Sequence, residues 1–309
     1  MAWIRSTLSF PLVTALKDKD EAFFRDRSEK FANGASDGHF DGCFGALDGL
    51  AIRIKRPTRT EKLRDPGAYY CRKGFHALNV QAICDSDKKI LWLSSSHQGS
   101  CHDSTAWTAC KVYKVLQVRS DWLYQNNWFI AGDSAYNMES FLLVPFDKPD
   151  MRRAVGQMED NYNFYHSNCR IRIECTFGEL IMRWGIFWRK LQVDLKSVGH
   201  VVETAALLHN FIIDERLEQE KANDNDYFAT FSHSNLRSEN EVDDEIPVAI
   251  VSNTTQPKPP GRPSLSDTIS KEKGKNLRQV ICWDLDRNNY KRPKQHGFKY
   301  NEYGMVYME

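Results

Sequence analysis

The stretch FGALDGLAIRI, residues 44–54, has the pattern of a buried strand with an acidic residue at its centre. Side chains at every second position of a strand share one face of the sheet. The predicted face consists of Phe44, Ala46, Asp48, Leu50, Ile52 and Ile54. A carboxylate that is buried alone is costly and takes up a proton instead of staying ionised. We therefore interpret Asp48 as a candidate functional residue on a core strand, although the following Gly49 also fits a turn.

Two more acidic residues occupy comparable positions. Asp133 follows the apolar run at residues 128–131 and Gly132, where a strand would end. Glu174 lies beside an apolar stripe with helical spacing. The stripe is Ile173, Phe177, Leu180, Ile181 and Trp184. Divalent cations can keep three converging carboxylates ionised, as in a two-metal phosphodiester-cleaving site. For Asp133 alone, a strand-end or turn role is the alternative.

The order of predicted elements points to an α/β layer architecture. We expect three antiparallel strands, then a helix, two more strands and two long helices. Their predicted ranges are strands at 43–56, 75–84 and 89–95, a helix at 103–118, strands at 128–131 and 142–146, and helices at about 167–188 and 197–217. This order resembles the ribonuclease-H-like fold, a mixed sheet flanked by helices.

Five sequence motifs occur along the chain in one order. They are YYCRKGFHALNVQAICD at 69–85, HQGSCHDS at 97–104, GDSAY at 132–136, RIRIECTFG at 170–178 and ALLHNFI at 206–212. Together they resemble the DDE superfamily endonuclease domain of PIF/Harbinger transposases, and they are similar to the domesticated Harbinger-derived nuclease of animals. The resemblance covers roughly residues 40–215.

The resemblance implies a function and a set of site residues. Asp48, Asp133 and Glu174 would be the catalytic acids and the ligands of two Mg²⁺ or Mn²⁺ ions that cleave DNA. Asp103 is predicted to be a helix N-cap, with an outer position in the metal site as the alternative. The resemblance also implies a separate, Myb-like DNA-binding partner. We find no helix-turn-helix in the 47 residues before Asp48, so autonomous target recognition is not expected.

Basic residues predict where DNA binds. Residues 53–73 carry eight Lys or Arg side chains and two acidic ones, directly after the Asp48 strand. Two further arginines precede Glu174 on its predicted helix, and for Arg170, one turn before Glu174, an ion pair with Glu174 is the alternative to a phosphate contact. The predicted phosphate contacts are Arg53, Lys55, Arg56, Arg59, Lys62, Arg72, Lys73, Arg170 and Arg172. Clustered Lys and Arg side chains bind phosphates by charge, but a solvated loop is the alternative for residues 53–73.

Charge segregation predicts three regions. Residues 1–40 are expected to form a short helical lead, residues 41–218 the DDE endonuclease core, and residues 219–309 a low-complexity, mostly disordered tail. Residues 214–245 carry eleven acidic and three basic side chains, and residues 258–299 carry eleven basic and four acidic ones. Such segments bury too little apolar surface to fold alone.

The remaining composition narrows the class of protein. The eight cysteines form no CxxC pair, so no zinc signature or disulfide framework is predicted. No run approaches the roughly 18 apolar residues of a membrane span. A DNA substrate implies the nucleus, and the basic cluster at 291–294 fits nuclear import. The alternative function is a catalytically silent, domesticated transposase core that acts as a DNA- or partner-binding adaptor.

Overall fold

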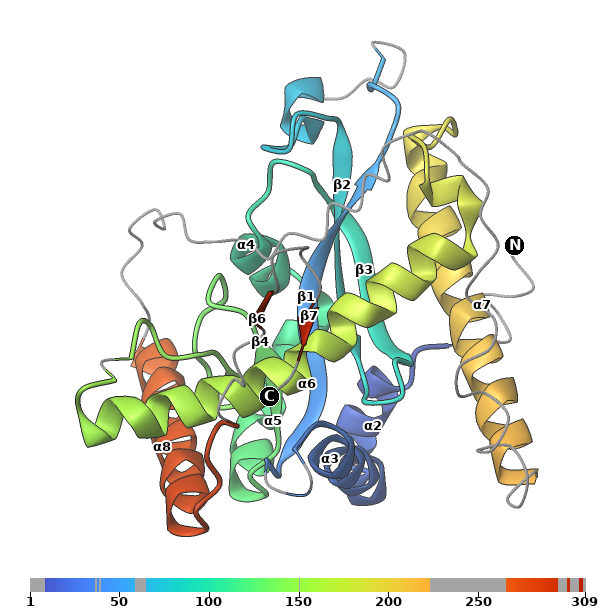
Figure 1. Cartoon of the computed structure of the whole chain (residues 1–309). Helices are drawn as coiled ribbons and strands as arrows, with labels where there is room; N and C mark the ends of the chain where they lie inside the picture. The colour runs from blue at the N-terminus through green and yellow to red at the C-terminus, as the bar shows by residue number, and fades with distance from the viewer. Residues whose placement is uncertain are drawn as a thin grey trace.

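The computed structural model describes residues 9–36, 38, 40–58, 65–149, 151–222, 265–293, 299–300 and 306–307. At its centre lies a mixed sheet of five strands with the order β3-β2-β1-β4-β5 (Figure 1). β1, β2 and β3 pair antiparallel, whereas β4 runs parallel to β1 and β5 runs parallel to β4. The strands are β1 (Cys43–Arg53), β2 (Ala77–Cys84), β3 (Ile90–Gln98), β4 (Phe129–Gly132) and β5 (Leu142–Leu143).

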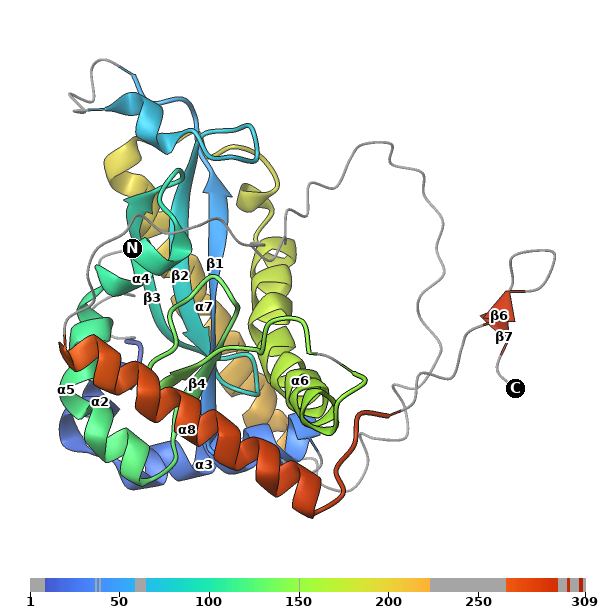
Figure 2. The same cartoon turned by 90° about the vertical axis from the view of Figure 1, so that its left-hand side faces the viewer.

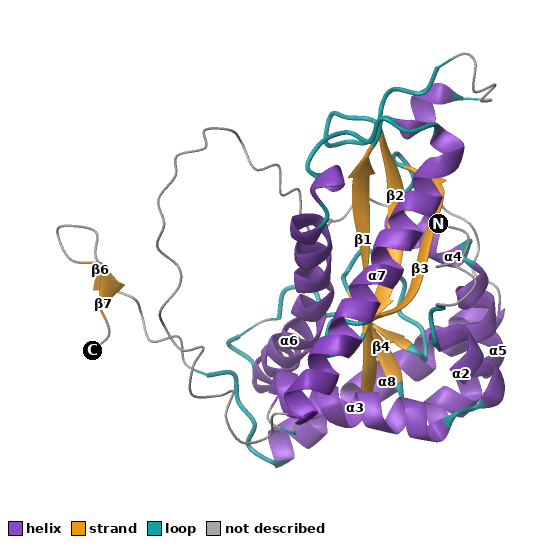
Figure 3. Ribbon diagram, turned by 90° about the vertical axis from the view of Figure 1, so that its right-hand side faces the viewer, coloured by secondary structure: helices purple, strands orange, loops and turns teal. Residues whose placement is uncertain are grey.

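Helices cover both faces of this sheet (Figure 3). One face packs against α6 and α7, and the other packs against α2, α4 and α5. The helices are α2 (Leu12–Asp18), α3 (Glu21–Ser36), η2 (Pro66–Tyr69), α4 (Asp103–Thr108), α5 (Lys111–Gln125), α6 (Ala154–Arg183), η3 (Gly185–Phe187), α7 (Leu195–Ala222) and α8 (Leu265–Arg287). A separate two-stranded pairing joins β6 (Lys299–Tyr300) and β7 (Val306–Tyr307). The predicted α/β, ribonuclease-H-like architecture is confirmed.

Apolar side chains of β1 alternate between the two cores, as the sequence predicts. Ala46 faces α6 and α7, and Leu47 faces α2 and α5. The prediction that Phe44 shares the face of Ala46 is wrong. A register shift at the start of β1 turns Phe44 to the α2–α5 side, where its ring centre lies 4.8 Å from that of Phe24. A bulge of this kind is not visible in the apolar pattern, because both faces are apolar there.

The single helix predicted at 103–118 is two helices. α4 ends at Thr108 and α5 begins at Lys111, because Cys110 has an extended backbone with φ −71° and ψ 147°. The break allows both segments to bury a large ring in one core. Trp107 of α4 lies 5.7 Å from Tyr113 of α5, measured between ring centres.

Helix α6 begins at Ala154, thirteen residues before the predicted start at Ser167. About half of the added residues are polar, and the stripe of Met158, Tyr162 and Tyr165 relies on tyrosines, so it is a weak signal for a helix. Their partner is far away in the sequence: Arg292, just after α8, pairs with Asp160 of α6 at 3.0 Å. Long-range contacts of this kind stabilise a helix that local periodicity does not predict.

Helix α8, at Leu265–Arg287, lies within the tail at residues 219–309 that was predicted to be mostly disordered, and it is an ordered exception. It packs at the β5 edge of the sheet, beside α5 and α6 (Figure 2). Leu277, Cys282 and Leu285 are buried in the core that contains α6 and α7. Gly274 allows α8 to approach the backbone of Glu139 closely, because an added Cβ would lie 2.3 Å from the Glu139 carbonyl oxygen. The sequence prediction failed here because the apolar residues are few and their partner surface comes from another part of the chain.

The predicted helical lead corresponds to α2 and α3, which pack on α5, β1 and α6. The division of the chain into three regions stays a prediction. Within the residues that the structure describes, no helix has both the length and the apolar composition that crossing a bilayer requires.

Candidate acidic site

Two of the predicted acids lie side by side on neighbouring strands. In the parallel β1–β4 pair, Leu47 is opposite Gly132, so the next residues, Asp48 and Asp133, are adjacent. Both residues are buried. The backbone N–H of Gly49 donates to Asp48 Oδ1 at 2.7 Å, and a similar bond at 2.8 Å fixes Asp133 Oδ1. The strand register therefore fixes the positions of these two carboxylates.

The third acid reaches the same place from α6. Arg170 Nη2 lies 2.6 Å from Glu174 Oε1, and Arg170 Nη1 lies 3.8 Å from Asp48 Oδ2. Nη1 is buried and makes no hydrogen bond within the described part of the chain. A single guanidinium therefore connects the acid on β1 with the acid on α6.

The carboxylates change one another's proton affinity. Burial, and then the neighbouring Asp133 charge, raise the pKa of Asp48 to about 7, while Arg170 opposes this shift. Burial also raises the pKa of Asp133, against the Ala135 N–H and Arg170. Glu174 contributes a further charge that raises it. Burial is the main cause of both shifts, and the positive charge of Arg170 opposes them.

The donor set fits a divalent metal ion in its chemistry. Mg²⁺ and Mn²⁺ prefer hard carboxylate oxygens, and the three acids provide them. However, among the described residues no three acidic, Cys or His side chains are arranged as a ready metal site. The guanidinium of Arg170 lies between Asp48 and Glu174, so this ion pair has to open before all three acids can share a cation.

Asp103 lies on the opposite face of the sheet. The prediction that it caps α4 is wrong: His102 holds the N-cap position, and Asp103 is the first helical residue. Its Oδ1 atom accepts hydrogen bonds from Asn79 Nδ2 at 2.7 Å and Gln81 Nε2 at 2.8 Å. Tyr136 in turn donates its hydroxyl to Gln81 Oε1 at 2.7 Å. The Asp103 charge still raises the pKa of both Asp48 and Asp133.

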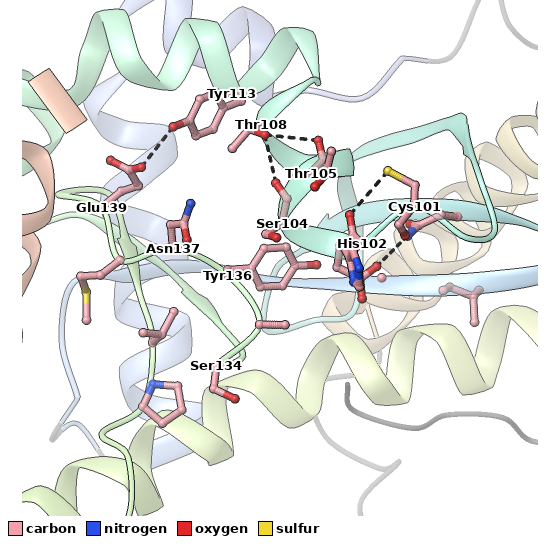
Figure 4. A pocket seen from close by; sticks show the side chains of 18 of the residues that line it. Cys101, His102, Ser104, Thr105, Thr108, Tyr113, Ser134, Tyr136, Asn137 and Glu139 are labelled. Carbon is pink, nitrogen blue, oxygen red and sulfur yellow. Dashed lines mark hydrogen bonds between the residues drawn. The ribbon is translucent and has the colours of Figure 1, made fainter. Parts of the chain in front are cut away.

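A large groove of about 1800 Å³ lies on the Asp103 side (Figure 4). Its walls are residues 70–74, residues 99–105, the loop 134–139 and α8. Asp48, Asp133 and Glu174 do not line it, but Ser134 and Ala135 directly after Asp133 do. Figure 4 shows Tyr136 between the α4 segment and this loop, with Tyr113 bonded to Glu139 at the far end. The acids and the groove therefore share one loop.

The predicted phosphate contacts form no single track. Arg53 lies 4.3 Å above the Phe75 ring, and Lys55 pairs with Asp194 at 3.3 Å. Arg56 is exposed. These three residues lie at the far end of β1, away from the acids. Arg59 and Lys62 lie outside the described residues.

The other four predicted contacts divide between two places. Arg72 and Lys73 line the groove. Burial lowers the pKa of the Lys73 amine, and the negative charges of Asp103 and Asp48 oppose this shift. Arg170 lies among the acids. Arg172 instead donates Nη2 to the Gly34 carbonyl of α3 at 2.6 Å, so it points away from Glu174.

The family described as DDE superfamily endonuclease matches residues 47–210, which is more than half of the chain. The chain belongs to the DDE superfamily endonuclease family. Asp48, Asp133 and Glu174 lie within the matched range. Comparisons with curated proteins and with solved structures gave no match.

Sequence reasoning missed several residues around the candidate site. Asn79, Gln81 and Tyr136 form a buried polar network that positions Asp103. Asn79 and Gln81 are polar residues at alternate positions of an otherwise apolar strand, and this spacing is a signal for a polar cluster on one face. The role of Arg170 as the shared counter-ion was only partly expected, since the sequence suggested either a phosphate contact or a pair with Glu174.

Proposed function

We propose that this DDE superfamily endonuclease is a divalent-metal-dependent DNA nuclease of the Harbinger type. Its proposed catalytic residues are Asp48, Asp133 and Glu174. The observation that carries the proposal is the meeting of three carboxylates around one guanidinium, that of Arg170. Such a cluster of carboxyl groups with raised pKa values is typical of a functional site, and divalent cations can keep converging carboxylates ionised.

The proposed metal ions, Mg²⁺ or Mn²⁺, supply the charge that activates water and stabilises the leaving oxygen of a phosphodiester. The chain's own residues hold the ligands in place. Asp48 and Asp133 each accept a backbone N–H on Oδ1, which fixes the direction of the second oxygen. Because β1 and β4 share one register, this arrangement is rigid before any substrate arrives.

Arg170 has two proposed roles. Without a cation it neutralises part of the charge, through the 2.6 Å pair with Glu174. If Asp48, Asp133 and Glu174 held a cation, Arg170 would be released from Glu174 and could bind a substrate phosphate, for which its planar fork is well suited. Its unbonded Nη1 atom is consistent with this second role.

DNA is the proposed substrate, and the nucleus is the proposed location. Arg72 and Lys73 line the groove beside the acid site and supply positive charge for phosphates. A Myb-like protein is the proposed partner for recognition of the target sequence. We propose Asp103 as an outer acid that acts on the site through charge, because the sheet separates its carboxylate from the Asp48 face.

Cleavage of supercoiled plasmid by the purified protein tests the proposal. We expect nicking that requires Mg²⁺ or Mn²⁺ and is lost in Asp133→Asn. Asp18→Asn is the matched control, since it removes the same charge from an exposed position at the end of α2. Equal nicking by wild type and Asp133→Asn would show that the acids are not the site.

One observation favours a second function, a silent DNA- or partner-binding adaptor. The guanidinium of Arg170 occupies the space between Asp48 and Glu174, and a permanent ion pair there would exclude a metal ion. Titration calorimetry with Mg²⁺ and Mn²⁺ separates the two functions. An adaptor of this kind binds DNA but gives no metal-binding heat that depends on Asp133 and no nicking.

A further inference from the structure

The segment after α6 returns to the far end of β1. Leu191 donates its N–H to the Arg53 carbonyl and accepts the Lys55 N–H, both at 3.0 Å, in a short parallel pairing. This pairing places Arg189 and Lys190 beside the basic end of β1. The joined segments form a surface that no motif in the sequence marks.

The surface combines exposed aromatic and positive groups. It consists of Arg56, Ile186, Trp188, Arg189 and Lys190, here called the Trp188 surface. Trp188 is 59% exposed and Ile186 is 50% exposed, and the three basic residues are exposed as well. None of these three basic side chains forms an ion pair within the described residues.

The indole of Trp188 is held in place although it faces solvent. Its Nε1 atom donates to the Ile181 carbonyl at the end of α6, at 2.9 Å. An exposed ring with a fixed edge bond loses little conformational freedom when a flat group stacks on its face. A base of a nucleic acid is such a group, and stacking on aromatic side chains beside basic residues is how single strands are bound.

Two elements connect this surface with the acid site. On α6, the helix end at Arg183 comes nine residues after Glu174, which is roughly 14 Å along the axis. On β1, Arg53 comes five residues after Asp48, which is roughly 17 Å. One DNA strand advances about 3.4 Å per phosphate along the duplex axis, so the separation corresponds to about four or five nucleotides.

We infer that the Trp188 surface binds the substrate DNA strand about four or five nucleotides from the cleavage site, with an unstacked base on Trp188 and phosphates on Arg56, Arg189 and Lys190. This inference rests on the proposed function for DNA as the substrate. It adds a contact that positions the strand and takes no part in the chemistry.

Fluorescence anisotropy with labelled DNA in EDTA tests the inference without cleavage. A single strand and a duplex of the same sequence are titrated with protein. We expect Trp188→Ala to weaken single-strand binding by about five- to hundredfold, the range for loss of one stacked base. Trp188→Phe keeps a ring and should retain most of the affinity. We expect Arg189→Ala combined with Lys190→Ala to make the slope of log K against log salt concentration less steep, by roughly 0.7 per lost phosphate contact.

Matched controls separate this surface from general effects. Trp283→Ala removes another tryptophan, 55% exposed on α8. Lys111→Ala combined with Lys114→Ala removes two exposed charges from α5. Both controls should bind DNA as the wild type does. Wild-type affinity in Trp188→Ala, equal losses in both tryptophan variants, or no DNA binding by the wild type would each overturn the inference. DNA binding that depends on Trp188, without plasmid nicking, would support this surface while the proposed nuclease activity fails.

Discussion

The carboxylate of Asp103 lies directly over Gly49, the residue that follows Asp48 on β1. An added Cβ at Gly49 would lie 2.3 Å from Asp103 Oδ1 and 2.6 Å from Gln81 Nε2. These two groups are buried and hydrogen-bonded to each other. Because successive side chains point to opposite faces, one dipeptide holds an acid on one face of the sheet and makes room for a second acid on the other.

Gly49→Ala should therefore destabilise the protein. The methyl group forces Asp103 or Gln81 out of their hydrogen-bonded network. Overpacking of this kind typically lowers the free energy of unfolding by about 1–3 kcal/mol. Gly185→Ala is the control, because nothing lies within 4 Å of a Cβ built there. Denaturant unfolding measures both. Equal stability of the two variants would show that the Asp103 network adjusts without cost.

Arg170→Ala should make the stability of the protein depend on metal. The variant leaves three acids without their shared counter-ion, and loss of one partner from a mostly buried pair costs roughly 3 kcal/mol. Added Mg²⁺ should restore part of this loss, because it stabilises a folded state that binds it. The melting temperature with and without Mg²⁺ gives the result.

The control for Arg170→Ala is Arg25→Ala. Arg25 forms an (i, i+4) pair with Glu21, in which the side chains are 66% and 58% exposed. Loss of such a surface pair should cost no more than about 0.5 kcal/mol, with no added response to Mg²⁺. If Mg²⁺ raised the melting temperature of both variants equally, the effect would not come from the acid site.

Asp48 should make the metal-free protein less stable as the pH rises. Its pKa of about 7 in the folded protein lies above the ordinary value of 3.8 for an aspartic acid. Between these two values the folded protein binds more protons than the unfolded chain, so the free energy of unfolding falls with increasing pH. Asp48→Asn removes this contribution. The free energy of unfolding of the variant, relative to that of the wild type, should therefore increase by up to roughly 4 kcal/mol between about pH 4 and 7.

Denaturant unfolding in EDTA across this pH range tests the Asp48 prediction. The signature is a difference between Asp48→Asn and wild type that grows as the pH rises. Parallel stability curves would mean that the Asp48 carboxyl is not perturbed by its surroundings.

Gly274→Ala should release α8 from the core. A Cβ there would lie 2.3 Å from a backbone oxygen of Glu139, which cannot move aside as a flexible side chain can. We expect faster proteolytic cleavage within residues 265–287, seen by mass spectrometry of timed digests. Asn276→Ala changes an exposed residue of the same helix and should leave the cleavage rate unchanged. An unchanged rate in both variants would contradict the importance of this contact.

The sequence alone predicted the strands that carry the acids and the helix that carries Glu174. This succeeded because Asp48 and Asp133 interrupt apolar runs, and such interruptions are local features. It predicted the ends of α6 poorly, since the turns before Ser167 depend on contacts with residues near Arg292. Long-range packing of this kind leaves no periodic signal.

The basic residues show a second limit of the sequence. Arg53, Arg72 and Arg172 look equivalent in a charge pattern, but the structure places them over an aromatic ring, in the groove and against α3. A charge pattern gives the sign of the net charge of a segment, whereas the direction of each long side chain depends on its neighbours. The family match supports the general class of endonuclease, and the roles of the individual acids stay predictions.

Helix α8 is joined to α7 by residues 223–264, so the helix that packs beside Glu139 belongs to the same chain as its binding surface. Docking inside one molecule does not depend on protein concentration, whereas association of two molecules does. If the chain were cut anywhere in that connection, α8 would become a separate ligand of the core. Dilution would then release it, and the edge of the sheet beside β5 would be covered only at high concentration.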